Sequence, residues 1–180
     1  ALEFDGTDDY VEFGDAFDIS DSVQRTFSLW FRRKSSTSED VLFAKKTGSG
    51  TATAGYMLFI NGSTDKLNFQ VADGTNDYLV ISNSTVTDQD WHHVAVQYNP
   101  LDINAINVFL DGSIDVGSKA GSLVSGGTIS GTFSNDKEFR LGLTSTSSGA
   151  FHGILDDLRI YATSMTGTEI TQLGSGKKTT

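Results

Sequence analysis

Short apolar alternations separated by turn signals constrain this chain more than any other feature. In segment 27–31 Phe27, Leu29 and Phe31 share one face, and in segment 67–71 apolar and polar residues alternate with a period of two before the turn signal Asp73-Gly74. That period is typical of a half-buried strand. Similar segments recur at intervals of roughly 8–14 residues, as in β-sandwiches and barrels. About a dozen strands in a chain of this length favour a two-sheet antiparallel jelly-roll sandwich over a small barrel.

One helix interrupts this all-β pattern. Thr166 and Glu169 have the spacing of a capping box, which predicts a short helix over residues 167–173. The small, polar stretches 47–54, 117–134 and 144–150 are expected to be loops. We expect one domain over residues 1–173, followed by a flexible tail or linker over 174–180.

Composition excludes several classes of function. The net charge of −10 argues against a nucleic-acid partner, which needs a basic face. The apolar runs are only a few residues long, so membrane insertion is not expected. The chain has no cysteine, which removes disulfides, thiolate metal sites and cysteine nucleophiles. A first residue Ala1 fits an excised domain or a processed product.

Four segments, in order, resemble one family. They are LEFDGTDDYV from residue 2, FSLWF from residue 27, DWHHVAV from residue 90 with VFLDG from residue 108, and FHGILDDLRIY from residue 151. Together they resemble laminin-G-like and pentraxin-like domains of the concanavalin A-like lectin/glucanase superfamily. The resemblance implies a jelly roll of two curved sheets in an extracellular or cell-surface module. It does not imply one ligand, because this fold hosts lectins, enzymes and adhesion modules.

Acidic residues suggest a calcium site. If the first and last strands lie side by side, Asp5, Gly6 and Asp8 can converge with Asp156 and Asp157 to supply the oxygen ligands that calcium prefers. The resemblance supports such a structural calcium near these loops. The alternative is that these acidic turn residues are simply solvated, since Asp favours turns through its own backbone hydrogen bonds. A second acidic cluster, Asp15, Asp18 and Asp21, has no such support and is interpreted as surface.

Catalytic and histidine–metal interpretations lack the residues they need. His92 and His93 are neighbours on an expected strand, so they point to opposite faces and cannot both bind one ion. Related glucanases carry Glu-x-Asp-x-Glu on one strand, whereas here Glu3 and Asp5 are followed by Thr7. A Gly-x-Ser-x-Gly nucleophile elbow is also missing from the sequence. We therefore expect a protein that is not an enzyme.

A glycan-binding site needs an aromatic ring beside fixed polar groups. Tyr56, Asn76 and Tyr78 lie near expected loop ends and are candidate ligand-binding residues, although the two tyrosines also fit ordinary core positions. Trp91 is interpreted as core. Trp30 fits either a core position or an exposed surface. The Asn61 and Asn83 sequons carry no weight in a chain rich in Ser and Thr.

The sequence thus predicts a non-catalytic extracellular binding module that recognises a glycan or a cell-surface partner, with a structural calcium ion. One alternative is a structural or adhesive protein–protein module of a surface assembly, through self-association or through other modules of a longer chain. A weaker alternative is a polysaccharide-active enzyme.

Overall fold

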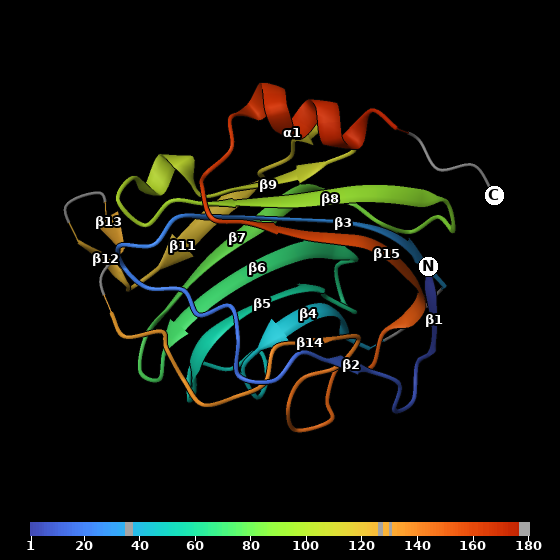
Figure 1. Ribbon diagram of the computed structural model, residues 1–180, viewed down its shortest axis with the longest axis horizontal. Coiled ribbons are helices and arrows are strands. Elements are labelled where there is room, and N and C mark those ends of the chain that lie inside the picture. The colour runs from blue at the N-terminus through green and yellow to red at the C-terminus, as the bar shows by residue number, and fades with distance from the viewer. Residues whose placement is uncertain (35–37, 126–127, 130, 177–180) are drawn as a thin grey trace.

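Two antiparallel sheets pack face to face in this computed structural model, which describes residues 1–180 except 35–37, 126–127, 130 and 177–180 (Figure 1). In spatial order, the six-stranded sheet consists of β1 (Leu2–Asp5), β15 (His152–Tyr161), β3 (Arg25–Arg33), β8 (Trp91–Tyr98), β9 (Asn107–Leu110) and β10 (Ser113–Ile114). The seven-stranded sheet consists of β11 (Ser118–Gly121), β7 (Asp77–Thr85), β6 (Lys66–Asp73), β5 (Ala54–Ile60), β4 (Asp40–Lys45), β14 (Arg140–Leu141) and β2 (Val11–Glu12). The predicted jelly-roll sandwich is confirmed.

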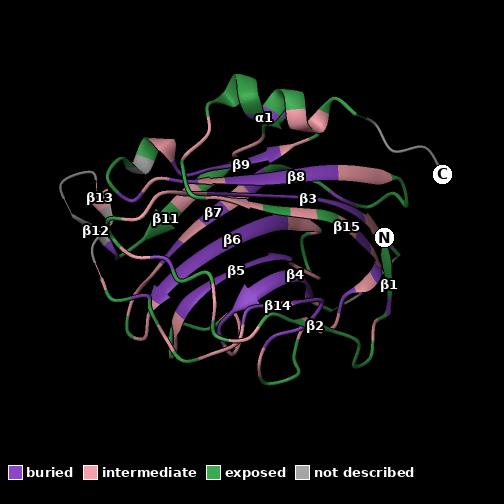
Figure 2. Cartoon of the chain, in the orientation of Figure 1, coloured by how far each residue is buried: buried purple, intermediate pink, exposed green. Residues whose placement is uncertain are grey.

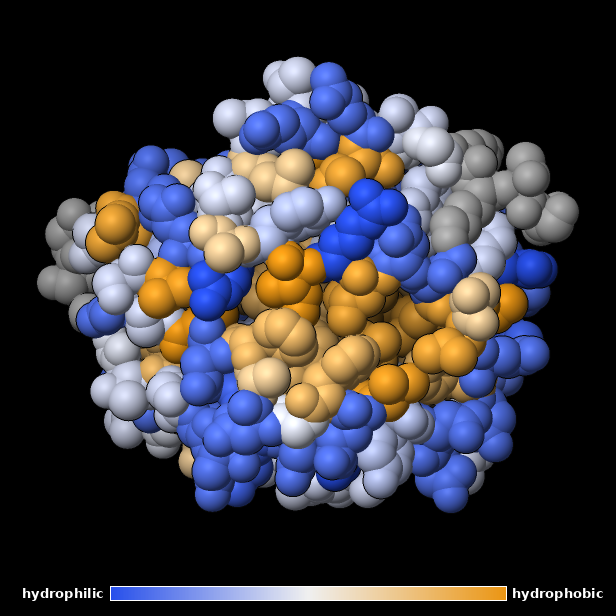
Figure 3. All heavy atoms as spheres, in the orientation of Figure 1, coloured by the Kyte–Doolittle hydropathy of each residue, from blue (hydrophilic) through white to orange (hydrophobic). Residues whose placement is uncertain are grey.

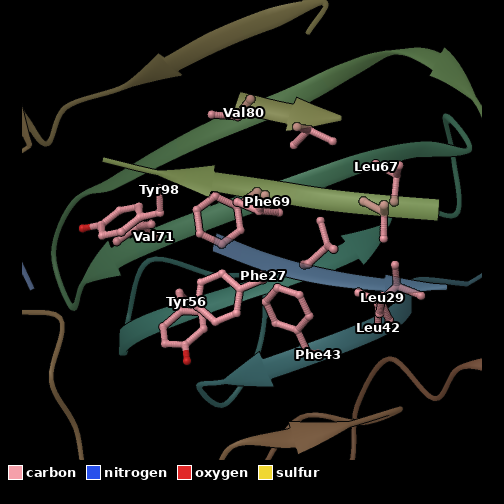
Figure 4. Packing of buried hydrophobic residues seen from close by; sticks show 14 of the residues in the cluster. Phe27, Leu29, Leu42, Phe43, Tyr56, Leu67, Phe69, Val71, Val80 and Tyr98 are labelled. Atoms are coloured by element: carbon pink, nitrogen blue, oxygen red, sulfur yellow. The ribbon is translucent and has the colours of Figure 1, made fainter. Parts of the chain in front are cut away.

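The core lies between the sheets and is built from the alternating residues of the central strands. The Phe27 ring lies 5.0 Å from that of Phe43 and 5.2 Å from that of Tyr56, measured between ring centroids (Figure 4). Strands β4 to β6 are buried along almost their whole length (Figure 2). A chain that buries a core of this extent does not need disulfides to stay folded.

The β3–β8 ladder decides which side chains face away from this core. Phe31 is opposite His92, and Trp30 is opposite His93. Opposed residues share a face of the sheet, and neighbours along a strand alternate. Phe31 belongs to the core cluster, so Trp30 and His93 lie on the outer face of the six-stranded sheet.

That outer face also carries the helix α1 (Gly167–Gly174) (Figure 1). Both hydrogen bonds of the predicted capping box form between Thr166 and Glu169. Ile170 packs against Ala95 and Phe109, which anchors the helix to the sheet. Among the described residues, no helix is long and apolar enough to cross a membrane.

Two element boundaries in the structure differ from those expected from the sequence. Segment 117–134, expected to be a loop, contains β11, which pairs with β7, and a small ribbon of β12 (Val124–Ser125) and β13 (Thr128–Ile129). The helix also includes Gly174, which we placed in the tail. A 3-10 turn, η1 (Ile103–Ala105), precedes β9. Residues 177–180 of the expected tail lie outside the described residues.

Candidate functional site

The turn after β1 gathers carboxylates. One oxygen from each of Asp5, Asp8 and Asp9 lies within 4.8 Å of the others, and all three residues are exposed. The turn is fixed by its own backbone, because the Asp5 N–H donates to Asp9 Oδ2 at 2.9 Å and the Thr7 N–H to Asp5 Oδ1 at 2.8 Å. Gly6 has a φ of 81°, which glycine adopts without strain. This donor set suits a hard cation such as calcium.

Asp156 and Asp157 do not join this turn, so their expected convergence on Asp5 is wrong. Strands β1 and β15 do lie side by side, but they are antiparallel, and Asp5 is opposite His152. Asp156 instead lies at the other end of β1, where its Oδ1 forms an ion pair with the Ala1 amino group at 3.1 Å. Asp157 is bound by Arg159, whose Nε and Nη2 donate at 2.9 Å.

The candidate sugar-binding tyrosines are core residues, which is the alternative that the sequence left open. Tyr56 is 0% exposed and Tyr78 is 1% exposed. The Tyr56 hydroxyl donates to the Phe17 carbonyl at 2.6 Å, and burial raises its pKa well above the ordinary value. Neither ring offers a face to a ligand. Asn76 lies in the β6–β7 turn, where its Oδ1 accepts from the Ser122 hydroxyl at 2.9 Å.

The outer face of the seven-stranded sheet is largely closed. Its apolar residues Met57 and Phe59 are 0% and 3% exposed. Gln70 Oε1 accepts from Lys46 Nζ at 3.1 Å, and Gln70 Nε2 donates to Asp77 Oδ2 at 2.7 Å. The Gln70 amide is therefore already engaged within the protein, and the neighbouring apolar side chains have little surface on which a sugar could stack.

A pocket of about 280 Å³ lies at the edge of the outer face of the six-stranded sheet where β8 begins, beside the end of α1, so that His92, from the other face of β8, also lines it. Its lining consists of Trp30, Asp90, Trp91, His92, Asp111 and Gly174. Trp30 is 5% exposed, whereas Trp91 is partly exposed. The chain has two tryptophans, and both line this one pocket. We call it the tryptophan pocket.

A two-residue hairpin places Asp111 at the pocket. Leu110 pairs with Ser113 across the β9–β10 turn, and the two turn residues, Asp111 and Gly112, have φ values of 50° and 77°. Positive φ at both positions is the type I′ geometry that Asp-Gly favours. The Asp111 Oδ1 then accepts from the His93 N–H at 2.9 Å.

His92 is held between two carboxylates. Its Nδ1 lies 2.8 Å from Asp111 Oδ2, and its Nε2 lies 2.8 Å from Asp88 Oδ1. The hydrogen bond to Asp111 is the main cause that raises the pKa of His92 to about 9, against the opposing effect of burial. At neutral pH, His92 is therefore a cation that donates from both ring nitrogens.

His93 has the opposite character. Its ring lies against Trp30 with centroids 5.2 Å apart, and its Nε2 shares a 2.8 Å hydrogen bond with the Ser28 hydroxyl. Burial lowers the pKa of His93 to about 4, so the ring is neutral at neutral pH. Its Nδ1 has no hydrogen-bond partner among the described residues and faces Gly174, where an added Cβ would lie 2.9 Å away.

A second surface is apolar and lies on the flank of the sandwich, between β15 and the β14–β2 pair (Figure 3). Phe13 is 43% exposed, Phe17 is 39% exposed, and their rings are 6.3 Å apart. Beside them, Leu2 and Leu158 line a pocket of about 190 Å³. We call this surface the apolar flank. Exposed apolar patches of this kind mark interaction surfaces.

Most of the tryptophan pocket does not follow from the sequence pattern, in which Trp91 fits a core position and Trp30 fits either a core position or an exposed surface. The signal was the period of two, which puts Trp30 on the face opposite Phe31, together with the acidic pair Asp88 and Asp90 directly before Trp91. The expectation that His92 and His93 point to opposite faces is confirmed by their opposed residues, Phe31 and Trp30.

Several solved structures share this fold. Domain 4 of AbnA, an extracellular arabinanase from Geobacillus stearothermophilus solved with arabinotriose, is 18% identical at a TM-score of 0.67, over 96% of this chain and 75% of that chain. The sialidase module CBM40 from Ruminococcus gnavus, bound to α2,3-sialyllactose, is 15% identical at a TM-score of 0.63, over 92% and 96%. A pentraxin from Limulus polyphemus is 15% identical at a TM-score of 0.64, over 96% and 80%. At such identities the likeness shows the fold alone.

The family is shown by sequence. No curated protein matches the chain. A family model matches residues 5–171, which is most of the sandwich and the start of α1. The resemblance of the four segments is thereby confirmed. This chain belongs to the concanavalin A-like lectin/glucanases superfamily.

Proposed function

We propose that this chain is a non-catalytic, extracellular module that binds a glycan in the tryptophan pocket. The observation that carries the proposal is that both tryptophans line one hollow together with Asp90 and Asp111. Sugars bind by stacking their C–H faces on aromatic rings while fixed polar groups take the hydroxyls. Two of the similar structures hold arabinotriose and sialyllactose, which supports a glycan as the class of ligand.

The electrostatics of the two carboxylates that hold His92 favour binding over hydrolysis. Glycoside hydrolysis needs a carboxylic acid that is still protonated near the working pH. Burial alone would raise the pKa of Asp111, but hydrogen bonds from His92 and from the His93 N–H outweigh it and lower that pKa. The pKa of Asp88 is lowered in the same way, by the Asp90 N–H and His92. Both carboxylates are anions at neutral pH and cannot donate a proton.

We also propose that a structural calcium ion is held by the turn after β1. Asp5, Asp8 and Asp9 would supply the carboxylate oxygens, and the ion would offset the mutual repulsion of three exposed charges. Its role would be to brace this turn beside the β1–β15 pair, about one strand length away from Asp156. The ion plays no part in the proposed contacts of the glycan.

Intrinsic fluorescence tests the glycan proposal directly, because both emitting residues line the pocket. We would titrate the protein with arabino-, cello-, chito- and sialyl-oligosaccharides. A saturable change in emission is expected with at least one of them, and Trp91→Ala should abolish binding measured by calorimetry. Phe13→Ala is the matched control, since it removes an exposed aromatic ring from the apolar flank and should leave binding unchanged.

Binding that survives Trp91→Ala would exclude the tryptophan pocket as the glycan site. If no oligosaccharide of the panel binds, the glycan proposal fails and the apolar flank becomes the better candidate. That flank favours a second function, a protein–protein contact in a surface assembly. Sedimentation velocity over a range of concentrations tests it: Phe13→Glu should abolish any concentration-dependent association.

A further inference from the structure

Most of the charged side chains at the tryptophan pocket are negative. Asp90 and Asp111 line it, and Asp88 lies behind His92. These three carboxylates outnumber the two cations beside them, the His92 imidazolium and the Arg32 guanidinium, whose Nε donates to the Gln89 carbonyl at 2.8 Å, so one net negative charge remains around the pocket at neutral pH. Such a surface repels anions and favours a cation.

The positive side chain that lines the pocket, His92, is already matched by carboxylates. His92 directs both ring nitrogens to carboxylates, each at 2.8 Å, so its charge is shared between Asp88 and Asp111. It has no ring N–H left to donate to a ligand. The repulsion between the His92 imidazolium and a ligand cation is therefore small.

Asp90 is the pocket carboxylate that does not bind His92. Its backbone N–H donates to Asp88 Oδ1 at 3.0 Å, which fixes the turn and presents the residue at the pocket. Among the described residues, no hydrogen bond or ion pair takes up its side-chain oxygens. A charged acceptor without a partner at the rim of a pocket is free to bind a ligand cation.

The helix end adds to this field. Gly174, the last residue of α1, lines the pocket, and the last turn of the helix contains no basic residue. The C-terminal end of a helix carries a partial negative charge that cations complement. The indole faces of Trp30 and Trp91 are a further attraction for an organic cation.

We propose that the glycan bound in the tryptophan pocket carries a protonated amine, an unacetylated hexosamine whose ammonium group pairs with Asp90 while its ring packs on Trp91. This inference rests on the proposed function and names the class of sugar. An amino sugar joins an apolar C–H face, hydroxyls and a cation in one unit, which are the three features that the pocket complements. A lysine side chain would share only the ammonium group and an apolar stem.

Three trisaccharides with one backbone geometry test the proposal at pH 6. They are the β-1,4 trimers of glucosamine, of N-acetylglucosamine and of glucose, titrated by fluorescence and calorimetry. We expect the glucosamine trimer to bind at least ten times more tightly than the other two, and its affinity to fall as salt is raised. Asp90→Asn should remove the preference. Asp102→Asn, which neutralises an exposed carboxylate in another loop, is the control and should keep it.

The outcomes separate the two proposals. Equal binding of all three trimers, unaffected by Asp90→Asn, overturns the ammonium assignment but leaves the glycan function standing. Binding of a blocked lysine peptide without any trisaccharide overturns the sugar assignment in favour of a protein partner. If neither the trimers nor the peptide bind, the inference fails, and the wider oligosaccharide panel then decides the proposed function separately. Circular dichroism of Asp90→Asn confirms that any loss is not unfolding.

Discussion

The imidazole of His93 lies against the indole of Trp30, with ring centroids 5.2 Å apart, while the adjacent His92 packs against Phe31 at 5.7 Å. Two neighbours in the chain thus lie on opposite faces of β8. His93 is 1% exposed, and its burial outweighs the attraction of Asp111 and Asp157, whereas His92 is held by two carboxylates at the strand end. Their pKa values therefore move in opposite directions from the ordinary value.

This difference predicts a stability maximum near pH 6.5. The pKa of His93 is about 4 in the folded protein, so between pH 4 and 6.5 the unfolded chain binds more protons, and stability rises with pH. The pKa of His92 is about 9, so between pH 6.5 and 9 the folded protein binds more protons, and stability falls as pH rises. Each limb should amount to about 2 kcal/mol, measured by urea unfolding from pH 4 to 8, because above pH 8 the lowered pKa of Lys46, about 8, opposes the alkaline limb.

Two variants test which histidine causes each limb of the stability profile. His92→Gln should flatten the alkaline limb and leave the acid limb, and His93→Gln should do the reverse. An alkaline limb that persists in His92→Gln would show that another group causes it. His152, which is also a histidine of the six-stranded sheet but lies on β15, serves as the control, and His152→Gln should preserve both limbs.

A second prediction concerns the buried ion pair at the end of β3. Arg33 Nε donates to Asp40 Oδ2 at 2.8 Å, and its Nη1 donates to Asp65 Oδ1 at 2.6 Å. Asp40 is 0% exposed, so Arg33→Met leaves a buried carboxylate without its main cation. The free energy of unfolding should fall by about 3–5 kcal/mol.

Urea unfolding at pH 7 measures this loss. Lys34→Met is the matched control, because the next residue along the chain pairs with Glu3 at the exposed surface. It should leave stability unchanged within error. The double variant Arg33→Met with Asp40→Leu should recover part of the loss, since it removes the stranded charge. Without such recovery, the cost would lie in packing and not in the uncompensated carboxylate.

The fold was predictable wherever periodicity is strong. The alternation in 27–31 and 67–71 predicts strands that the structure has, and the Thr166–Glu169 spacing predicts the start of α1. Strand β11 was not predictable, because its sequence, Ser118–Gly121, has no apolar period. It forms by pairing with β7, and such tertiary pairing overrides weak local preference.

The site was less predictable than the fold. The resemblance suggested that β1 and β15 are neighbours, but the register that separates Asp5 from Asp156 depends on pairing between the two ends of the chain, Leu2 with Leu155 and Asp5 with His152. From the sequence, Tyr56 and Tyr78 fit core positions of a strand as well as they fit ligand-binding positions. Only the packing of the two sheets shows that both rings are buried. The tryptophan pocket needs β3, β8, the β9–β10 turn and α1 together, and local sequence does not specify that assembly.

A third prediction concerns Gly55 in β5. Its φ is 127°, and an added Cβ would collide with the Lys45 carbonyl oxygen and lie 2.5 Å from Asn135 Nδ2. That amide donates to the Lys45 carbonyl at 3.0 Å and to the Ala54 carbonyl at 2.9 Å, so it bridges the β4–β5 hairpin. Gly55→Ala combines backbone strain with a broken bridge and should cost about 2–4 kcal/mol of unfolding free energy.

The control for this change is Gly50→Ala in the preceding loop. An added Cβ there meets no atom within 4 Å, and stability should stay within about 0.5 kcal/mol of the parent. Thermal unfolding by circular dichroism compares the two. Equal stability of both variants would mean that the hairpin relaxes to accept the methyl group.

The last prediction concerns calcium. If the turn after β1 binds the ion at about a hundred times its dissociation constant, the folded state gains about 2.7 kcal/mol. For a domain of this length that is a rise in Tm of roughly 5–10 °C between EDTA and millimolar calcium at fixed ionic strength. Asp8→Asn should abolish the rise, because the Asp8 carboxylate is one of the three that converge. Asp156→Asn should keep it, because that carboxylate binds the Ala1 N-terminus instead. A rise lost in Asp156→Asn but kept in Asp8→Asn would move the ion to the other end of β1, and no rise in the parent protein, after exhaustive chelation, would leave the three carboxylates as a solvated turn.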